Sequence, residues 1–253
     1  MITKKNTKYN FNFCVSKTHN LIYNMDKTIV LIPSRLQASR LPNKPLLKIN
    51  NKSLIMHVYE IAKKSDIGDV YVATGDDLIF EEVIKNGAKC IKTNLNHMSG
   101  TDRIYEAFSK LQQRDIKYVI NLQGDEPMIN IEDIKNLKRQ TLKNKSEIST
   151  LACEINDQKK LNDESIVKVR TIDKISSENI SRAINFSRKK SYNSKENIYH
   201  HIGIYIYKTT TLKKFTELPQ TDKEKKQKLE QLRALENDIK IDVVRASTVP
   251  IGV

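Results

Sequence analysis

Three cations gather in residues 32–46, IPSRLQASRLPNKPL, which begin where the apolar run of residues 28–32 ends. Arg35, Arg40 and Lys44 could together offset most of the charge of a nucleoside triphosphate, because the guanidinium fork matches phosphate oxygens in a way that a lone ammonium does not. The chain contains no G-x-x-x-x-G-K-[ST] motif, which excludes a P-loop. The stretch indicates either a phosphate-binding loop or a solvated basic loop.

Two carboxylates follow another apolar run, in the segment NLQGDEP at residues 121–127. Gly124 permits a sharp turn, after which Asp125 and Glu126 stand at the rim of the predicted sheet. A hard cation such as Mg²⁺ is commonly held by one or two carboxylates together with substrate phosphates. A turn in which Asp125 binds only its own backbone is the alternative, and the position at a strand end favours the metal.

The segment NHMSGTDR, residues 96–103, precedes a helix that the apolar spacing predicts from about Thr101. Ser99 and Thr101 would offer hydroxyl and backbone N–H groups at the N-terminus of that helix, which is a natural site for an anion or a base edge. Either residue could also be the N-cap, and both roles can hold together.

Residues 199–208, YHHIGIYIYK, alternate as a strand does. Alternation would place His201, Gly203, Tyr205 and Tyr207 on one face, and a polar face with a glycine suggests space for a sugar-like ligand. Residues of this kind at the edge of a core are the alternative. The chain has no H-E-x-x-H motif and no paired His/Cys spacing, which disfavours a zinc site.

The elements that must position these segments alternate between strand and helix. Strands are predicted in the first half at residues 28–33, 69–74, 88–92 and 117–123, and helices after Ser53, after Asp76 as far as Gly87, and at 101–111 and 130–142. This alternation predicts an α/β fold, a mostly parallel sheet with helices on both faces. In an open parallel sheet, ligands bind beyond the carboxyl ends of the strands, where the segments lie.

The pattern loosens beyond about residue 145. Strands are predicted at 148–155, 165–172, 180–188, 200–208 and 240–247, with a helix at 223–237. We expect this half to complete the sheet and to add a small substrate-facing subdomain. No linker is long enough to separate two domains.

Composition narrows the function classes. The 253 residues carry a formal charge of +14, but the lysines are spread along the whole chain, which disfavours a nucleic-acid-binding patch and suits an anionic small substrate. The apolar runs are too short to cross a membrane. Cys14, Cys90 and Cys153 form no C-x-x-C pair, and isolated thiols suit a reducing cytoplasm.

Taken together, these segments resemble one family. IPSRLQASRLPNKPL, VYVAT, NHMSGTDR, NLQGDEPMI, HHIGIYIY and LEQLR occur in the order found in 3-deoxy-manno-octulosonate cytidylyltransferases, also called CMP-Kdo synthetases. The resemblance runs from about residue 27 to the end of the chain. It implies a Rossmann-like nucleotide-diphospho-sugar transferase fold, Mg²⁺ as cofactor, a homodimer, and transfer of CMP from CTP to 3-deoxy-D-manno-octulosonate (Kdo) for lipopolysaccharide assembly, with pyrophosphate as the other product.

The resemblance also implies roles for individual residues. The triphosphate would be bound by Arg35, Arg40 and Lys44, and Asp125 would hold Mg²⁺, so that the catalytic residues are Arg35, Lys44 and Asp125. Further nucleotide contacts would come from Thr74, Ser99, Thr101 and Gln123. The sugar-acid side would be lined by Gln123, Arg188, His201, Tyr205, Glu230 and Gln231.

Two departures from the family pattern stand out. Family members usually carry Asp after VAT, where this chain has Gly75, so a nucleotide-side contact is either supplied by Asp76 or missing. The family pattern V-P-x-G-V-D-T-P-E-D-L places a second metal ligand at its first Asp, and residues 249–253, VPIGV, match only its start. We therefore expect the 253-residue form to hold Mg²⁺ weakly and to be inactive or strongly impaired.

The N-terminal 25 residues contain no acidic residue and no sustained apolar stretch, which disfavours a secretory signal. We expect residues 1–25 to be a disordered extension and residues 26–253 to form the cytidylyltransferase domain, truncated at its C-terminus. Three other functions stay open on the sequence alone: a cytidylyltransferase for another acidic sugar, of sialic type or 8-amino Kdo, a nucleic-acid-binding protein, and a truncated, non-catalytic paralogue.

Overall fold

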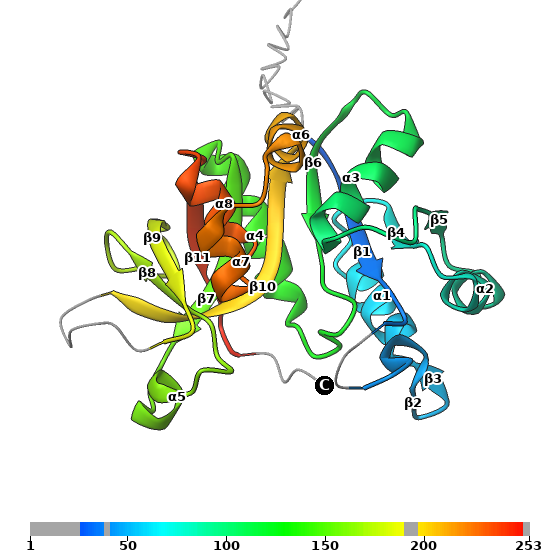
Figure 1. Ribbon diagram of the computed structural model, residues 1–253, viewed down its shortest axis with the longest axis horizontal. Helices are drawn as coiled ribbons and strands as arrows, with labels where there is room; N and C mark the ends of the chain where they lie inside the picture. The colour runs from blue at the N-terminus through cyan, green and yellow to red at the C-terminus, as the bar shows by residue number, and fades with distance from the viewer. Residues whose placement is uncertain (1–25, 38–40, 190–196, 250–253) are drawn as a thin grey trace, which may run out of the picture.

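The computed structural model describes residues 26–37, 41–189 and 197–249, and within them a twisted sheet of nine strands runs through the molecule. Helices cover both faces of this sheet (Figure 1). The α/β class predicted from the sequence is confirmed. The predictions for residues 1–25, for Arg40 and for residues 250–253 lie outside the described residues.

The strands lie side by side in the order β5 (Cys90–Lys92), β4 (Val70–Thr74), β1 (Lys27–Ser34), β6 (Ile116–Asn121), β10 (Ile198–Lys208), β7 (Ile148–Glu154), β11 (Ile241–Arg245), β9 (Ser181–Ser187) and β8 (Lys168–Thr171). The first four are parallel neighbours, as the strand and helix alternation predicts.

The second half of the sheet corrects the prediction of a mostly parallel arrangement. β10 lies between β6 and β7 and runs antiparallel to both, β8 and β9 pair antiparallel, and β7 and β11 are parallel. Parallel neighbours need a crossover connection of a dozen or more residues, and the link between β8 and β9 is shorter and carries no helix. The sheet is therefore mixed, and its parallel part is the half that contains β1 and β6.

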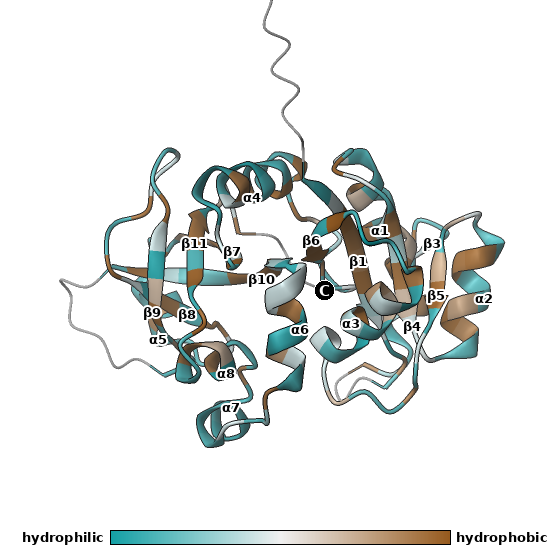
Figure 2. Ribbon diagram, turned by 90° about the horizontal axis from the view of Figure 1, so that it is seen from above, coloured by the Kyte–Doolittle hydropathy of each residue, from teal (hydrophilic) through white to brown (hydrophobic). Residues whose placement is uncertain are grey.

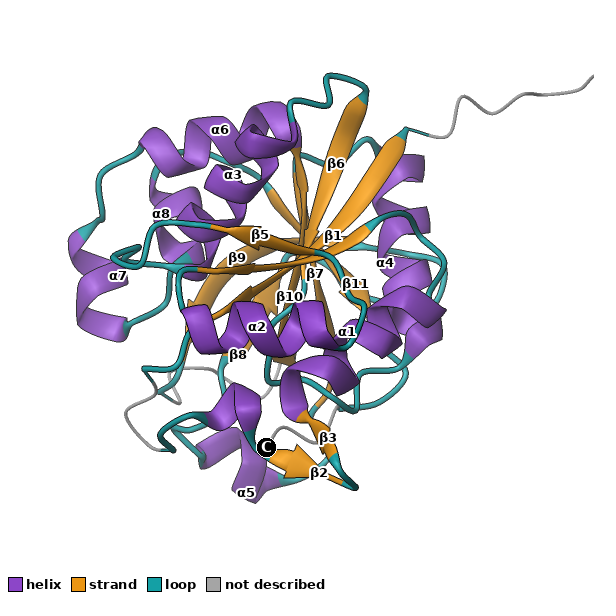
Figure 3. Cartoon of the chain, turned by 90° about the vertical axis from the view of Figure 1, so that its right-hand side faces the viewer, coloured by secondary structure: helices purple, strands orange, loops and turns teal. Residues whose placement is uncertain are grey.

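The helices divide between the two faces according to their apolar sides. One face is covered by α1 (Leu54–Lys64), α2 (Asp77–Lys85) and α4 (Ile131–Asn144). The other is covered by α3 (Gly100–Leu111), α6 (Thr209–Glu217) and α8 (Gln231–Glu236), which lie together on one side in Figure 3. The remaining elements are α5 (Gln158–Asn162), α7 (Asp222–Gln227), the short strands β2 (Lys48–Ile49) and β3 (Lys52–Ser53), and the 3-10 turn η1 (Lys44–Leu46).

Strand β1 shows why the central strands are continuously apolar. Val30 and Ile32 pack into the core on the side of α1, and Ile29 and Leu31 pack into the core on the side of α3, so both faces of the strand are fully buried. Figure 2 shows β1 as one of the hydrophobic strands inside a shell of more hydrophilic helices. A strand of this kind is rigid, and the loop that follows it begins from a fixed position.

The predicted helix at residues 223–237 is in fact two helices. Lys228 adopts a left-handed backbone with φ 54°, which ends α7 before α8 begins. The buried ion pair of Glu224 and Arg233, 2.6 Å between Oε1 and Nη2, holds the two helices together. The break places Glu230 at the N-terminus of α8, against α3.

The face of β10 that carries His201, Tyr205 and Tyr207 alternates as predicted, but it is covered. The ring centroids of His201 and Tyr205 lie 5.4 Å apart, and those of Tyr205 and Tyr207 lie 5.8 Å apart. Tyr207 in turn contacts Phe215 of α6. These side chains therefore belong to the core, because α6 and α8 pack over the strand.

Within the described residues, none of the helices is both long and apolar enough to span a bilayer.

Candidate active site

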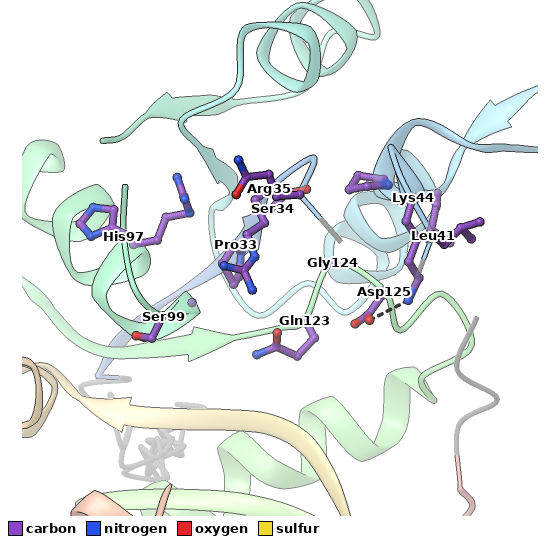
Figure 4. A pocket seen from close by; sticks show the side chains of 15 residues that line it. Pro33, Ser34, Arg35, Leu41, Lys44, His97, Ser99, Gln123, Gly124 and Asp125 are labelled. Atoms are coloured by element: carbon purple, nitrogen blue, oxygen red, sulfur yellow. Dashed lines mark hydrogen bonds and ion pairs between the residues drawn. The ribbon is translucent and has the colours of Figure 1, made fainter. Parts of the chain in front are cut away.

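A cavity of about 630 Å³ opens at the carboxyl ends of β1 and β6. It is lined by Pro33, Ser34, Arg35, Gln37, Leu41, Lys44, Pro45, Leu54, His97, Ser99, Gly100, Arg103, Gln123, Gly124 and Asp125. Figure 4 shows Lys44 and Asp125 at one side of it, His97 and Ser99 at the other, and Arg35 between them. Three of the four segments chosen from the sequence therefore meet at the edge of the sheet where an α/β fold binds its ligands.

Lys44 and Asp125 come from segments 81 residues apart, and their side chains meet in this cavity, 2.8 Å from Nζ to Oδ2. The turn η1 positions the lysine: Asn43 before it has a left-handed backbone with φ 56°, and Pro45 follows it within the turn. The side chain of Lys44 is 17% exposed and that of Asp125 is 52% exposed, so the carboxylate is the group open to a ligand.

The turn after β6 is built around Gly124. A Cβ atom on this residue would lie 3.1 Å from the carbonyl oxygen of Pro33 and 3.3 Å from the side chain of Ile55, so a side chain would crowd the end of β1. The absence of a side chain lets the loops after β1 and β6 approach each other, which is how Lys44 and Asp125 reach one cavity.

Glu126 points away from solvent beside Asp125. Its Oε2 atom is buried and, among the described residues, has no hydrogen-bond partner. Burial, with a smaller contribution from the Asp125 charge, raises the pKa of the Glu126 carboxyl to about 7. The two carboxyls of the segment therefore have different environments, and Asp125 is the one presented to the cavity.

The start of α3 forms the opposite wall. Ser99 is its N-cap, because its Oγ accepts a hydrogen bond from Asp102 N at 3.0 Å, and it also lines the cavity. Thr101 is buried and donates its hydroxyl hydrogen to Glu230 at 2.9 Å. The other carboxyl oxygen of Glu230 is buried and lies 3.8 Å from Arg233 Nη2, but it has no hydrogen-bond partner among the described residues, and burial raises the pKa of this group. A buried oxygen of this kind could accept a hydrogen bond from a ligand hydroxyl.

The predicted site residues fall into three groups by position. The residues that line the cavity are Arg35, Lys44, Ser99, Gln123 and Asp125. The residues that are buried behind it, outside its lining, are Thr74, Thr101, His201 and Tyr205. Of the remaining three, Glu230 contacts Thr101, Gln231 is the first residue of α8, and Arg188 donates to the backbone carbonyl oxygens of Glu164 and Ser165.

Two of the buried residues have defined partners. His201 contacts the Thr150 hydroxyl, 3.0 Å from Nε2, and burial lowers the pKa of its imidazole to about 3, so the ring is neutral. The hydroxyl of Thr74 accepts a hydrogen bond from Asp76 N at 3.1 Å. The side chain of Asp76 does not cap α2, and instead accepts a hydrogen bond from Leu36 N in the loop after β1.

Reasoning from the sequence missed His97 and Arg103, which also line the cavity. Both lie in the segment NHMSGTDR, where attention went to the hydroxyl residues. Arg103 is only 2% exposed although it is charged, and no signal in the sequence marked it, because an arginine on an amphipathic helix is ordinarily solvated.

The described residues bring no group of three or more His, Cys, Asp or Glu side chains together in a way that could hold a metal ion. An all-protein metal cage is therefore absent from the described part of the chain. Mg²⁺ does not require one, since it keeps several waters and is usually bound through one or two carboxylates and substrate phosphates. The half-exposed Asp125 carboxylate on the cavity wall fits that mode.

Comparison with known proteins gives consistent results. A family model described as cytidylyltransferase matches residues 29–241. The 3-deoxy-manno-octulosonate cytidylyltransferase of Bartonella quintana is 40% identical over 228 residues, 90% of this chain and 93% of that protein. The enzyme of the same name from Rhodopseudomonas palustris is 42% identical over 89% of this chain and 92% of its own length. A solved CMP:2-keto-3-deoxy-manno-octonic acid synthetase complexed with CTP aligns with a TM-score of 0.81 and 34% identity over 90% of this chain and 92% of that chain.

Proposed function

The chain belongs to the 3-deoxy-manno-octulosonate cytidylyltransferases, and we propose that its cavity transfers CMP from CTP to Kdo, giving CMP-Kdo and pyrophosphate. The observation that carries this proposal is the meeting of Lys44 and Asp125, at 2.8 Å, in one cavity that Arg35 also lines. A phosphate-binding cation and a carboxylate suited to a metal ion are both needed where a nucleoside triphosphate reacts.

The cations after β1 would bind the triphosphate. Arg35 can donate two parallel hydrogen bonds to phosphate oxygens, and Lys44 adds a compact charge beside them. Ser99 lines the same cavity from the other side, next to Gly100 at the start of α3. We assign that side to the cytidine, because Lys44 and Asp125 stand at the opposite side, which would receive the phosphates and the metal ion.

Asp125 is the residue that would hold Mg²⁺. The ion, when bound, would neutralise charge on the phosphate oxygens. In the structure Lys44 forms an ion pair with Asp125. Nucleotide binding would draw the lysine to the phosphates and leave the Asp125 carboxylate free to bind the metal ion. Glu126 stays beside it as a buried carboxyl whose raised pKa limits the negative charge at this point.

The sugar acid would bind between Gln123 and α8. A Cβ atom on Gly203 would lie 3.8 Å from Gln123 Cγ, so the strand passes close to this side chain without obstructing it. Glu230 offers its Oε1 atom to a sugar hydroxyl. His201 and Tyr205 would support the pocket from the core, and Gln231 and Arg188 are the remaining candidates for contact with the acid.

The reaction then needs positioning and charge stabilisation rather than a covalent intermediate. The anomeric hydroxyl of the sugar attacks the α-phosphorus while pyrophosphate leaves in line. Arg35 and Lys44 would stabilise the charge that builds on the leaving group, and Gln123 would help to orient the attacking sugar. We further propose, on the isolated thiols, that the reaction takes place in the cytoplasm, and on the family resemblance that it serves lipopolysaccharide assembly and that the enzyme is a homodimer.

The test is pyrophosphate release from CTP with Mg²⁺ and one sugar acid at a time. We expect Kdo to support the fastest release, with 8-amino Kdo and a sialic-type acid assayed beside it. Faster release with either of the other acids would move the assignment to that sugar. Failure to bind CTP in the presence of Mg²⁺ would contradict the proposed function itself.

A further inference from the structure

A buried arginine holds the chain segment that forms one wall of the cavity. Arg103, in the second turn of α3, is 2% exposed. Its guanidinium donates to the hydroxyl of Thr93 at 2.7 Å, to the carbonyl oxygen of Asn94 at 3.0 Å and to that of Leu95 at 3.3 Å. These acceptors lie in the connection between β5 and α3. We call its residues 93–97 the 93–97 segment.

Arg103 has no carboxylate within ion-pair distance in the part of the chain that the structure describes. Asp76 and Glu106 act on it only at longer range, and burial lowers the pKa of its guanidinium. Burying a cation without an ion-pair partner costs free energy, which the three hydrogen bonds of Arg103 must offset. All three go to the 93–97 segment, and a guanidinium can form such a fork where an ammonium cannot.

The same segment also lies against Gly75. A Cβ atom on this glycine would lie 2.5 Å from Leu95 Cα and 2.9 Å from the carbonyl oxygen of Asn94, which are backbone atoms that cannot turn aside. The 93–97 segment therefore lies directly on the end of β4. In this chain a side chain at position 75, where the family pattern has Asp, would displace the segment.

A carboxylate fixes the remaining end of the segment. Glu106 of α3 accepts a hydrogen bond from Asn94 N at 2.9 Å and contacts His97, which lines the cavity. Against the effect of burial, the hydrogen bond with Lys110, followed by those with Asn94 N and His97, lowers the pKa of the Glu106 carboxyl to about 2, so it is ionised at any ordinary pH. The segment is therefore held by Arg103, by Gly75 and by Glu106, and it carries His97 at the side of the cavity opposite Lys44 (Figure 4).

We propose that Arg103 is a positioning residue for recognition of the nucleotide base, which keeps the 93–97 segment against Gly75 so that the cavity wall facing the cytidine has one fixed shape. The inference rests on the proposed function, since the phosphates must occupy the side of Arg35 and Lys44 for the base to reach this wall. Arg103 lines the cavity itself, and we assign its effect on CTP to the segment that it holds.

The test separates the base from the phosphates. Calorimetry would compare the affinities of CTP, UTP and inorganic tripolyphosphate, each with Mg²⁺, for the unmodified chain and for R103K. The lysine keeps the charge but loses the fork, so we expect CTP to bind about tenfold more weakly, tripolyphosphate to bind unchanged, and the preference for CTP over UTP to shrink. An equal loss for CTP and tripolyphosphate, or no loss for either, would overturn the inference.

A second variant and a control keep the test independent of folding. G75A would push on the same segment, and we expect the same selective loss of CTP affinity. R182K is the control: it removes the fork of an arginine that pairs with Asp242 at 3.2 Å and does not line the cavity, and it should leave CTP affinity unchanged. If G75A spares CTP affinity, the segment does not shape the base site. The proposed function is tested separately on the unmodified chain. It requires CTP to bind more tightly than tripolyphosphate, because the cytidine must contribute to the affinity.

Discussion

Replacing Lys44 by Met should change two affinities in opposite directions. The substitution removes the cation that lies 2.8 Å from Asp125 and that we assign to the triphosphate. The Lys44–Asp125 pair is partly exposed, with the carboxylate 52% exposed, so solvent screening limits its net contribution to about 1 kcal/mol or less. Loss of a charged donor to a phosphate costs more, about 1.5–3 kcal/mol, which is about 10- to 10²-fold in affinity.

These magnitudes give distinct expectations for each ligand. CTP with Mg²⁺ should bind K44M about 10- to 10²-fold more weakly, because one of the phosphate-binding cations is gone. Mn²⁺ alone should bind about fivefold more tightly, because about 1 kcal/mol no longer holds Asp125 to the lysine. The free energy of unfolding should fall by no more than about 1 kcal/mol.

Titration calorimetry with CTP and with Mn²⁺, together with urea unfolding, measures all three quantities. K27M is the matched control. Lys27 forms an ion pair of 2.9 Å with Asp115 at the amino-terminal ends of β1 and β6, away from the cavity. It should change neither affinity. Unchanged CTP affinity in K44M, or weaker Mn²⁺ binding, would refute the reasoning that Lys44 serves the phosphates and occupies the metal ligand.

Three further predictions concern other parts of the molecule. His201 has a folded pKa of about 3 against about 6.5 unfolded, so the unfolded state takes up the proton first as pH falls. Because the raised pKa of Glu126 acts in the opposite direction, the comparison is with H201Q: between pH 6.5 and 5 the free energy of unfolding of the unmodified chain should fall by about 2 kcal/mol more than that of H201Q in urea titrations. E224A leaves Arg233 buried without its partner and should cost about 3–5 kcal/mol by thermal unfolding, whereas the double change E224L with R233M should cost much less. G68A would place a Cβ atom 1.9 Å from the carbonyl oxygen of Thr28. It should lower the free energy of unfolding by about 1–3 kcal/mol in the same assay. An unaffected variant would show that the turn before β4 can move.

Much of the fold follows from local pattern. The run at residues 28–32 has to be buried on both faces, and its end determines where the cations after β1 emerge. The sequence does not show which way a strand without a crossover helix runs, so the antiparallel insertion of β10 between β6 and β7 was not predictable. The break at Lys228 was also hidden, because a lysine in a left-handed conformation leaves no trace in a helical pattern.

In the site, too, some residues could be predicted from the sequence and others could not. Gly124 and Asp125 could be selected from the sequence, since a glycine turn at a strand end presents whatever follows it. Arg103 could not, because an arginine in an amphipathic helix is ordinarily solvated and only the packing shows that it is buried. The sequence left two roles open for the polar face of β10 for a related reason: whether His201 meets a ligand or the core depends on helices that follow it in the chain.

The central claim is that the cations after β1 and the carboxylate after β6 act on one triphosphate through a divalent ion. Crystals grown with CTP and Mn²⁺ and measured at the manganese absorption edge test this most directly. The account predicts an anomalous peak about 2 Å from an Asp125 oxygen, with the triphosphate contacting Arg35 and Lys44. A manganese peak or a triphosphate located away from Asp125 and Lys44 would contradict it.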